Sequence, residues 1–134
     1  MLYADDERIL VSAPNRAGEN FIRTLRAKQL PFAALVSSSR QQKSMESLGV
    51  KPIIYVDTTK HDSWIIPDYP IGKVFIFEDS LPLCCRYIQI CRGWTSKAMY
   101  VISHRGNPRM VYRGLGANHV VFANSEDVSY LIEA

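Results

Sequence analysis

The chain has 134 residues, of which 47% are hydrophobic and 22% are charged, and its formal net charge at pH 7 is +3. This length predicts a single domain over residues 1–134 that can bury a core without disulfides or metals. The basic residues are scattered rather than gathered in a stripe, so we do not expect direct nucleic-acid binding.

Three cysteines, Cys84, Cys85 and Cys91, lie in one short segment without CxxC or CxxH spacing. This odd count argues against a disulfide framework or a zinc site and favours a reducing compartment. Residues 1–10 lack the basic and apolar regions of a signal peptide, and no apolar run is long enough to span a bilayer. We therefore expect a cytoplasmic protein without direct membrane insertion.

The predicted elements alternate along the chain. Nearly continuous apolar runs are typical of strands covered on both faces, and apolar residues three and four apart, such as Phe21, Ile22 and Leu25, predict helices. In chain order we predict strand 8–13, helix 18–29, strand 31–37, helix 40–49, strand 51–57, an irregular stretch 58–72, strand 73–79, helix 80–94, strand 97–103, helix 106–116, strand 118–123 and helix 125–134.

The helix over residues 80–94 has clear local signals. Ser80 is a preferred N-cap residue, and Pro82 lies near the first turn, where proline is tolerated. The spacing predicts a buried helix face made of Leu81, Cys84 or Cys85, Ile88 and Cys91.

Six alternations of strand and helix predict right-handed crossovers and a parallel sheet. The fold class is therefore α/β: a single Rossmann-like, doubly wound domain with about six mostly parallel strands and helices on both faces. In such a sheet ligands bind outside the carboxyl ends of the strands. The loops that matter for function are therefore residues 12–18, 37–40, 57–59, 77–80 and 103–106.

Three stretches resemble the N-terminal lobe of the regulator of potassium conductance family, also called the TrkA-N or RCK domain. Residues 47–59, SLGVKPIIYVDTT, are similar to the family's G-V strand and its following G-D-A-T, with Asp57 on the family aspartate. Residues 100–124 are similar to its fifth strand, short helix and L-G-A-D-H-V-V ending, which here is LGANHVV. In the opening strand, turn and helix, Gly18 and the helix pattern agree.

The resemblance implies a regulatory domain rather than an enzyme. Members of the family bind NAD(H) or ATP/ADP and pair into dimers or rings that gate potassium channels and transporters. We therefore expect a homodimer that acts with a membrane transporter or channel subunit. The chain has neither the family's second lobe nor a pore, which implies a partner subunit or a longer protein.

The first candidate loop departs from the dinucleotide fingerprint G-x-G-x-x-G, because Ala13 and Asn15 replace its first two glycines. Gly18 keeps the third position, which permits close packing of helix on strand. Pro14 removes one backbone N–H, and the Asn15 side chain would occupy space that a pyrophosphate needs. Arg16 and the helix N-terminus keep a positive potential, so a phosphate could still bind. Both nucleotide binding and a purely structural turn stay open.

The second candidate loop follows the second strand, where NAD-binding domains carry an acidic residue. Here Ser37, Ser38, Ser39 and Arg40 stand instead. Either a 2′-phosphate binds among the serines and Arg40, or Ser39 caps the next helix and Arg40 is solvated. We favour the second alternative because serine clusters are common before helices.

The third strand ends at Asp57, which in the family lies by the adenine. The alternative is a local turn in which Asp57 bonds to Thr58 and Thr59. Glu78 and Asp79 end the fourth strand, and we expect both to be solvated loop acids. The complete set of candidate cofactor-binding residues is Ala13, Pro14, Asn15, Arg16, Gly18, Ser37, Ser38, Arg40, Asp57, Thr58 and Phe77.

Two other protein classes compete with the regulatory domain. An atypical short-chain dehydrogenase or NmrA-like NADP sensor shares the opening strands. Its Y-x-x-x-K motif is matched by Tyr69 and Lys73, but Pro70 and Gly72 lie between them and the segment enters a strand. We interpret this match as coincidence, and the isolated histidines lack a nucleophile at recognisable spacing. A degenerate interaction module that binds no nucleotide is supported by the altered residues 13–18.

Overall fold

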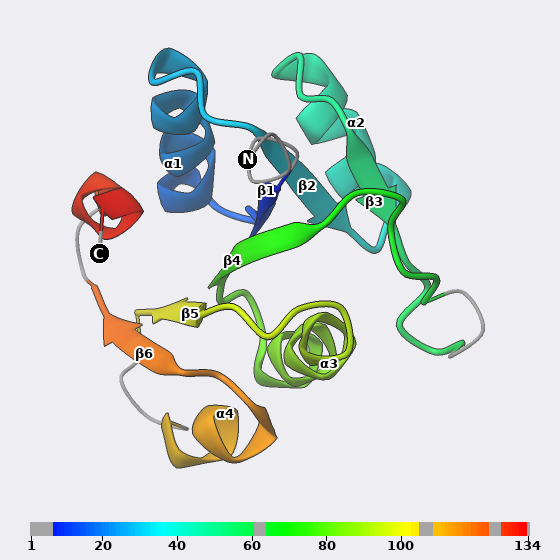
Figure 1. The fold of residues 1–134 in the computed structure, drawn as a ribbon, viewed down its shortest axis with the longest axis vertical. Coiled ribbons are helices and arrows are strands. Elements are labelled where there is room, and N and C mark those ends of the chain that lie inside the picture. The colour runs from blue at the N-terminus through cyan, green and yellow to red at the C-terminus, as the bar shows by residue number, and fades with distance from the viewer. Residues whose placement is uncertain (1–6, 61–63, 105–108, 124–126, 134) are drawn as a thin grey trace.

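The computed structural model describes residues 7–60, 64–104, 109–123 and 127–133. Six strands form one parallel sheet in the order β3-β2-β1-β4-β5-β6 (Figure 1). The order reverses between β1 and β4, which is the switch point of a doubly wound fold. The strands are β1 Arg8–Ser12, β2 Phe32–Val36, β3 Ile53–Tyr55, β4 Ile71–Phe77, β5 Met99–Ser103 and β6 His119–Phe122.

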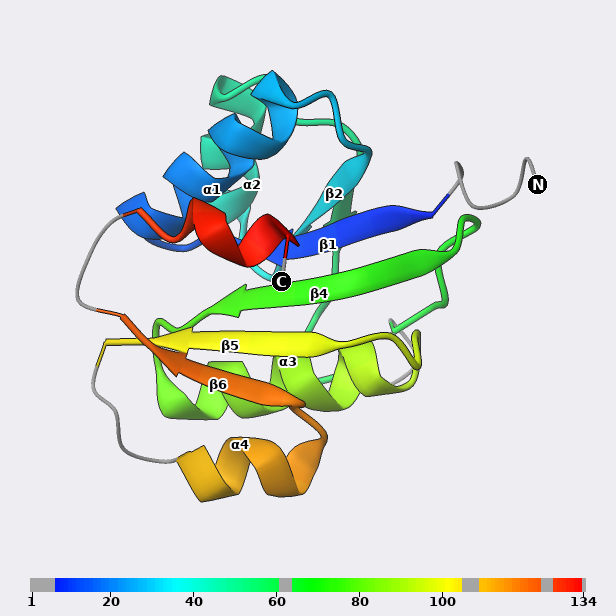
Figure 2. The ribbon, with the colours of Figure 1, turned by 60° about the vertical axis from the view of Figure 1, so that its left-hand side comes forward.

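Helices cover both faces of this sheet, as Figure 2 shows. One face carries α1 Arg16–Ala27, α2 Ser39–Ser47 and, at the end of the chain, the 3-10 helix η3 Ser129–Glu133. The other face carries α3 Leu81–Arg92 and α4 Arg109–Leu115. The predicted Rossmann-like α/β class is thereby confirmed.

The core consists of one apolar layer on each face of the sheet. Under α1, the ring of Phe21 packs 4.7 Å from that of Phe75, which in turn stacks on Tyr100 at 4.8 Å. Under α3, the core contains the buried side chains of Tyr87 and Ile88. Because the strands are buried on both faces, their sequences read as continuous apolar runs.

The local signals were mostly right, with corrections at the ends of elements. Ser80 caps α3 as predicted, but Leu81 is 40% exposed, and Tyr87 and Ile90 belong to the buried face instead. The cap of α2 is Ser38 rather than Ser39, since the Ser38 hydroxyl accepts a hydrogen bond from the Gln41 backbone N–H.

Among the segments that differ from the structure in extent are β4, β3 and the last helix. Strand β4 begins at Ile71, inside the stretch predicted as irregular, because Ile71 pairs with Arg8 of β1. Strand β3 has only 3 residues. The last predicted helix is a 3-10 helix that starts at Ser129, and Ser125, expected near its start, lies outside the described residues.

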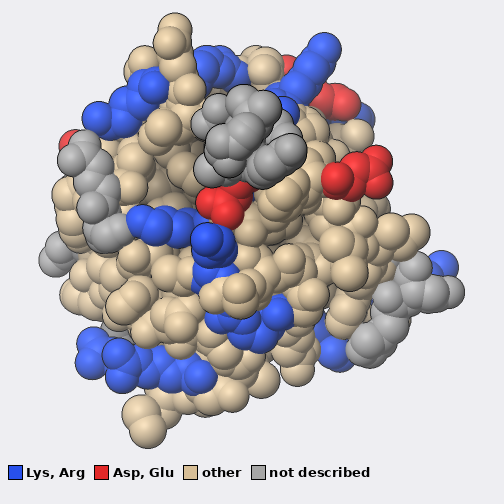
Figure 3. Space-filling model, in the orientation of Figure 1, with Lys and Arg blue, Asp and Glu red and all other residues tan. Residues whose placement is uncertain are grey.

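On the face shown in Figure 3, charged side chains of one sign do not form a single patch. Figure 3 shows Lys and Arg at several places around the face in view, with acidic side chains among them. In the described part of the chain, no helix combines the length and the apolar character needed to cross a membrane.

Candidate functional site

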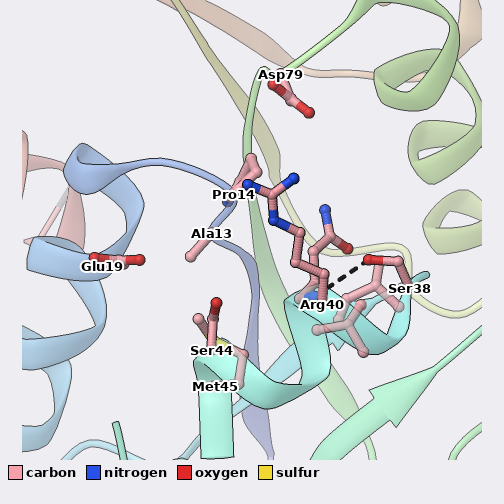
Figure 4. Close-up of a pocket in the computed structure, with 11 residues that line it drawn as sticks. Ala13, Pro14, Glu19, Ser38, Arg40, Ser44, Met45 and Asp79 are labelled. Atoms are coloured by element: carbon pink, nitrogen blue, oxygen red, sulfur yellow. Dashed lines mark hydrogen bonds between the residues drawn. The ribbon is translucent and has the colours of Figure 1, made fainter. Parts of the chain in front are cut away.

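A cavity of about 430 Å³ opens at the carboxyl ends of β1 and β2, between α1 and α2 (Figure 4). It lies beside the switch point, where doubly wound folds bind their ligands. Its lining residues are Ala13, Pro14, Glu19, Leu35, Val36, Ser38, Arg40, Gln41, Ser44, Met45 and Asp79. Four of the predicted site residues, Ala13, Pro14, Ser38 and Arg40, are therefore brought together here.

The β1–α1 loop (residues 13–15) is packed closely against α1. A Cβ atom on Gly18 would lie 2.7 Å from the Cα of Ala13 and 3.2 Å from the ring of Phe77. Gly18 thus has the packing role expected of the third fingerprint glycine. Phe77 is buried beneath the helix start and does not line the cavity.

Asn15 is the N-cap of α1. Its backbone is extended, with φ −135°, and its Oδ1 accepts a hydrogen bond of 2.9 Å from the Gly18 N–H. Its Nδ2 lies 3.4 Å from both the Glu78 carbonyl and His104 Nε2. The side chain therefore turns back onto the helix, and it uses the Gly18 N–H that would otherwise face a phosphate.

His104 helps to hold this cap from the end of β5. Its Nδ1 lies 2.9 Å from the Ala123 carbonyl, which can only accept, so Nδ1 carries the proton. In the neutral ring Nε2 is then an acceptor for the Asn15 amide. The loop after β1 is consequently tied to the loops after β4 and β5.

The β2–α2 loop (residues 37 and 38) is anchored from below by α3. The Tyr87 hydroxyl donates to Ser37 Oγ at 2.8 Å, and the Ser37 N–H donates to Gln41 Oε1 at 3.0 Å. Burial raises the pKa of Tyr87 to about 12, opposed by its bond to Ser37, so it stays a donor at neutral pH. Ser37 is therefore a structural residue that does not line the cavity.

Three charged side chains line the cavity. Arg40 extends from the first turn of α2 toward Pro14, with Asp79 beyond it, while Glu19 faces the space from α1 (Figure 4). The Arg40 guanidinium makes no hydrogen bond or ion pair within the described residues. It is thus available to an anionic ligand, whereas Glu19 and Asp79 disfavour one nearby.

Seven predicted site residues do not line the cavity: Asn15, Arg16, Gly18, Ser37, Asp57, Thr58 and Phe77. Asp57 forms the local turn that was the alternative interpretation, since its Oδ1 accepts hydrogen bonds from the Thr59 hydroxyl at 2.6 Å and the Thr59 N–H at 2.9 Å. These two bonds lower the pKa of Asp57. Arg16 is exposed at the start of α1.

Sequence reasoning missed several lining residues, among them Glu19, Gln41, Ser44 and Asp79. One signal was available for Ser44, because it lies four residues after Arg40 and therefore on the same helix face. No local signal places Asp79 beside α2, because that contact depends on the order of the strands.

The prediction that Glu78 is solvated is wrong. Glu78 is only 5% exposed, and its Oε1 accepts a 2.8 Å hydrogen bond from the Ser103 hydroxyl. The Tyr112 hydroxyl donates to Oε2, and burial together with this bond raises the pKa of Tyr112. The carboxylate thus fixes α4 to the end of β4 rather than facing a ligand. Asp79, the other acid of this pair, is exposed as predicted.

The described residues form no metal-binding cluster, and no cysteine is among the residues that line the cavity. No three His, Cys, Asp or Glu side chains there lie close enough to hold a metal ion. Cys84 and Cys91 are buried in α3, and burial raises the pKa of Cys84 to about 12. Lys73 lies in β4, so it shares no helical turn with Tyr69. This agrees with the interpretation that the Y-x-x-x-K match is a coincidence.

Comparison with solved structures identifies a domain of the same architecture over nearly the whole chain. The TrkA-N domain of the inner membrane protein ybaL from Escherichia coli matches with a TM-score of 0.65 and 14% identity, covering 96% of this chain and 95% of that one. The chain has the TrkA-N fold. The family resemblance seen in the sequence is confirmed at the level of the fold.

Two further structures share the TrkA-N fold with this chain. The NAD(P)-binding domain of an exopolyphosphatase-related protein from Archaeoglobus fulgidus has a TM-score of 0.65 and 18% identity, over 96% of this chain and 91% of that one. The GsuK channel bound to NAD has a TM-score of 0.67 and 16% identity, over 86% of this chain and 21% of the channel chain. No protein-family model and no curated protein matches the sequence.

Proposed function

We propose that the chain is a regulatory domain that senses an adenine nucleotide, NAD(H) or ATP/ADP, and transmits its binding through subunit assembly. One observation carries this proposal: the cavity of about 430 Å³ lies between the β1–α1 and β2–α2 loops, beside the switch point. This is where doubly wound folds bind nucleotides. In agreement, one structural neighbour is an NAD(P)-binding domain and another is a channel bound to NAD.

The cavity suits the adenosine end of such a ligand. Leu35, Val36 and Met45 give it an apolar part, while Ser38 and Arg40 supply polar groups. An apolar surface with a few placed polar groups is typical of small-molecule sites. The described residues around it offer no nucleophile with an adjacent base, which favours sensing over turnover.

The assembly part of the proposal rests on the neighbours. One neighbour belongs to an inner membrane protein and another is a channel. We propose a cytoplasmic homodimer that acts on a membrane transporter or channel subunit. Its test is the oligomeric state of the purified protein, by light scattering, with and without nucleotide. A monomer under both conditions would contradict it.

A second candidate function is an interaction module that binds no nucleotide. The Asn15 cap favours it, because the Gly18 N–H is already bonded and Pro14 has no N–H to offer. Glu19 and Asp79 add negative charge to the cavity. In this alternative the fold is retained and the cavity has no ligand.

Thermal unfolding of the purified protein separates the two functions. It is measured alone and with ATP, ADP, NAD, NADH and NADPH at millimolar concentration. A ligand that binds the folded state stabilises it by about 2.7 kcal/mol when its concentration is a hundredfold above its Kd. Nucleotide sensing predicts a rise in melting temperature with at least one of them, and the interaction module predicts none.

A pair of variants locates the binding site. Ser44→Trp puts a large side chain into the cavity, whereas Glu46→Trp puts the same group at an exposed residue on the other side of the same helix, which does not line the cavity. The S44W variant should lose the nucleotide-induced shift and E46W should keep it. If both variants respond as the natural protein does, the nucleotide binds elsewhere.

A further inference from the structure

We infer that the site selects adenine nucleotides that carry a phosphate monoester on the adenosine ribose, as in the NADP class, and that Arg40 binds this phosphate. The inference rests on the proposed adenine-nucleotide function and assigns it a ligand class other than NAD(H) or ATP/ADP. It places the anchoring anion at α2, opposite the α1 terminus that holds the pyrophosphate in dinucleotide-binding domains.

The α1 side of the cavity is poorly suited to a pyrophosphate. Pro14 has no backbone N–H, and the Gly18 N–H is bonded to Asn15 Oδ1 at 2.9 Å. Glu19, in the first turn of α1, lines the cavity on the same side, and a carboxylate there repels an anion. A pyrophosphate would have to displace the Asn15 side chain and approach this carboxylate.

The α2 side of the cavity is better suited to an anion. Domains that bind an unmodified ribose place an acid after the second strand, where it accepts from the 2′-hydroxyl. Here residues 37–40 contain no acid, and no lining residue from β2 or α2 is acidic. A ribose diol would therefore lack its usual acceptor, and a phosphate at that position would meet no like charge from this side.

Arg40 supplies the group that a phosphate monoester needs. It is the one cation among the lining residues, and its guanidinium has no partner within the described part of the chain. Guanidinium and phosphate pair through two parallel N–H···O bonds, which a hydroxyl cannot match. Ser38 and Ser44 line the same wall and offer hydroxyl donors within the cavity.

Within the described residues, Arg40 also has no ion pair that a ligand would have to break. The guanidinium extends across the opening toward Pro14, with Asp79 beyond (Figure 4). Because neither Glu19 nor Asp79 is paired with Arg40 in the structure, an incoming phosphate breaks no existing ion pair of that side chain. Binding then gains charge-assisted hydrogen bonds without first disrupting one.

The experiment compares matched ligands by isothermal titration calorimetry. Adenosine 2′-monophosphate is set against adenosine 5′-monophosphate, and NADPH against NADH, with inorganic phosphate as the control for a simple anion site. We expect the 2′-phosphorylated member of each pair to bind about tenfold more tightly or better, since one strong bond to a charged group has at least this effect. Equal affinity, or tighter binding of the 5′-phosphate, would overturn the inference.

Two charge-removing variants test the role of Arg40. Arg40→Gln should abolish the preference within each ligand pair. Lys43→Gln removes an equal charge from α2 at a residue that does not line the cavity, and should keep the preference. Unfolding without ligand verifies that both variants fold. If R40Q keeps the preference, Arg40 is not the phosphate ligand and the inference fails.

The outcomes also separate this inference from the proposed function. If NADH or ADP binds as tightly as NADPH, the nucleotide function stands and the 2′-phosphate selection is wrong. If inorganic phosphate competes as well as adenosine 2′-monophosphate, the cavity is a general anion site and the selection is wrong. If no nucleotide binds at all, both fail together.

Discussion

The β1–α1 and β2–α2 loops both connect a strand to a helix, but different contacts hold them in place. Each leads from a buried parallel strand into a helix, and each presents a side-chain cap, Asn15 to the Gly18 N–H at 2.9 Å and Ser38 to the Gln41 N–H at 3.2 Å. The first cap is also held by the Glu78 carbonyl and His104. The second loop is held from below by Tyr87 and from α2 by Gln41, and Ser38 lines the cavity.

The difference between the loops indicates where a ligand can be anchored. In the first loop the polar groups that a phosphate would need are used to hold the fold together. In the second loop the structural contacts use Ser37 and Gln41, and Arg40 remains available. Because the caps use a backbone donor at the start of each helix, the anchor expected for an anion is the Arg40 side chain rather than a helix N-terminus.

The largest expected effect is that of Gly18→Ala, which tests the close packing of the first loop. The added Cβ would lie 2.7 Å from the Cα and 2.8 Å from the Cβ of Ala13, so backbone has to move. We expect the free energy of unfolding to fall by about 1–3 kcal/mol in urea denaturation. Gly114→Ala is the control, because nothing lies within 4 Å of its Cβ, and it should stabilise α4 by about 0.5–1 kcal/mol. If the G18A variant is as stable as the natural protein, close packing against Ala13 does not require a glycine at this position.

The next effect compares the two caps directly. Asn15→Ala and Ser38→Ala should each lower the free energy of unfolding by about 1 kcal/mol, the usual value for an N-cap. The Asn15 substitution should lower the free energy of unfolding more than the Ser38 substitution, because the Asn15 amide also contacts the Glu78 carbonyl and His104. Chemical denaturation of both variants measures the difference. A larger loss for S38A would reverse the contrast between the loops.

A similar or smaller effect is expected for Tyr87→Phe, which removes the support of the second loop. Its hydroxyl donates to Ser37 Oγ, so the variant should lose about 1 kcal/mol of stability by urea denaturation. Tyr55→Phe is the matched control, since Tyr55 is 48% exposed. Equal effects of the two substitutions would show that the bond to Ser37 contributes nothing to stability.

The smallest effect concerns the loop after β3, which lies outside the cavity. Hydrogen bonds from Thr59 hold the pKa of Asp57 below its ordinary value of 3.8. Because the folded-state pKa is depressed, the stabilisation is complete above about pH 3.8 and is lost as the pH falls through the folded pKa. Asp57→Asn should therefore weaken the fall in the free energy of unfolding at acid pH and leave its pH dependence elsewhere unchanged. Urea denaturation at several pH values between about 2 and 5, the range where carboxylates titrate, measures this change. Asp68→Asn, in an exposed loop, is the control, and an equal change there would contradict the role of Asp57.

Local sequence signals determined the elements and their class. Buried parallel strands have continuous apolar runs, and Phe21, Ile22 and Leu25 mark the buried face of α1, because the periods of the backbone fix which side chains share a face. Ser80 correctly predicted a helix start, because an N-cap depends only on residues next to it in the sequence. Gly18 correctly predicted the close packing of α1 on the loop after β1. The six-stranded α/β architecture could therefore be predicted before the structure was known.

Tertiary structure decided which ends of these elements meet. Asp79 and Arg40 line one cavity because crossovers place β4 and β2 on either side of β1, and no local pattern encodes that order. Glu78 is buried rather than solvated because Ser103 and Tyr112, far away in the sequence, supply hydrogen bonds that offset its desolvation. The sequence by itself determined the strands, helices and most caps, since these depend on neighbours along the chain. The site, which depends on contacts between distant segments, was decided only by the folded arrangement.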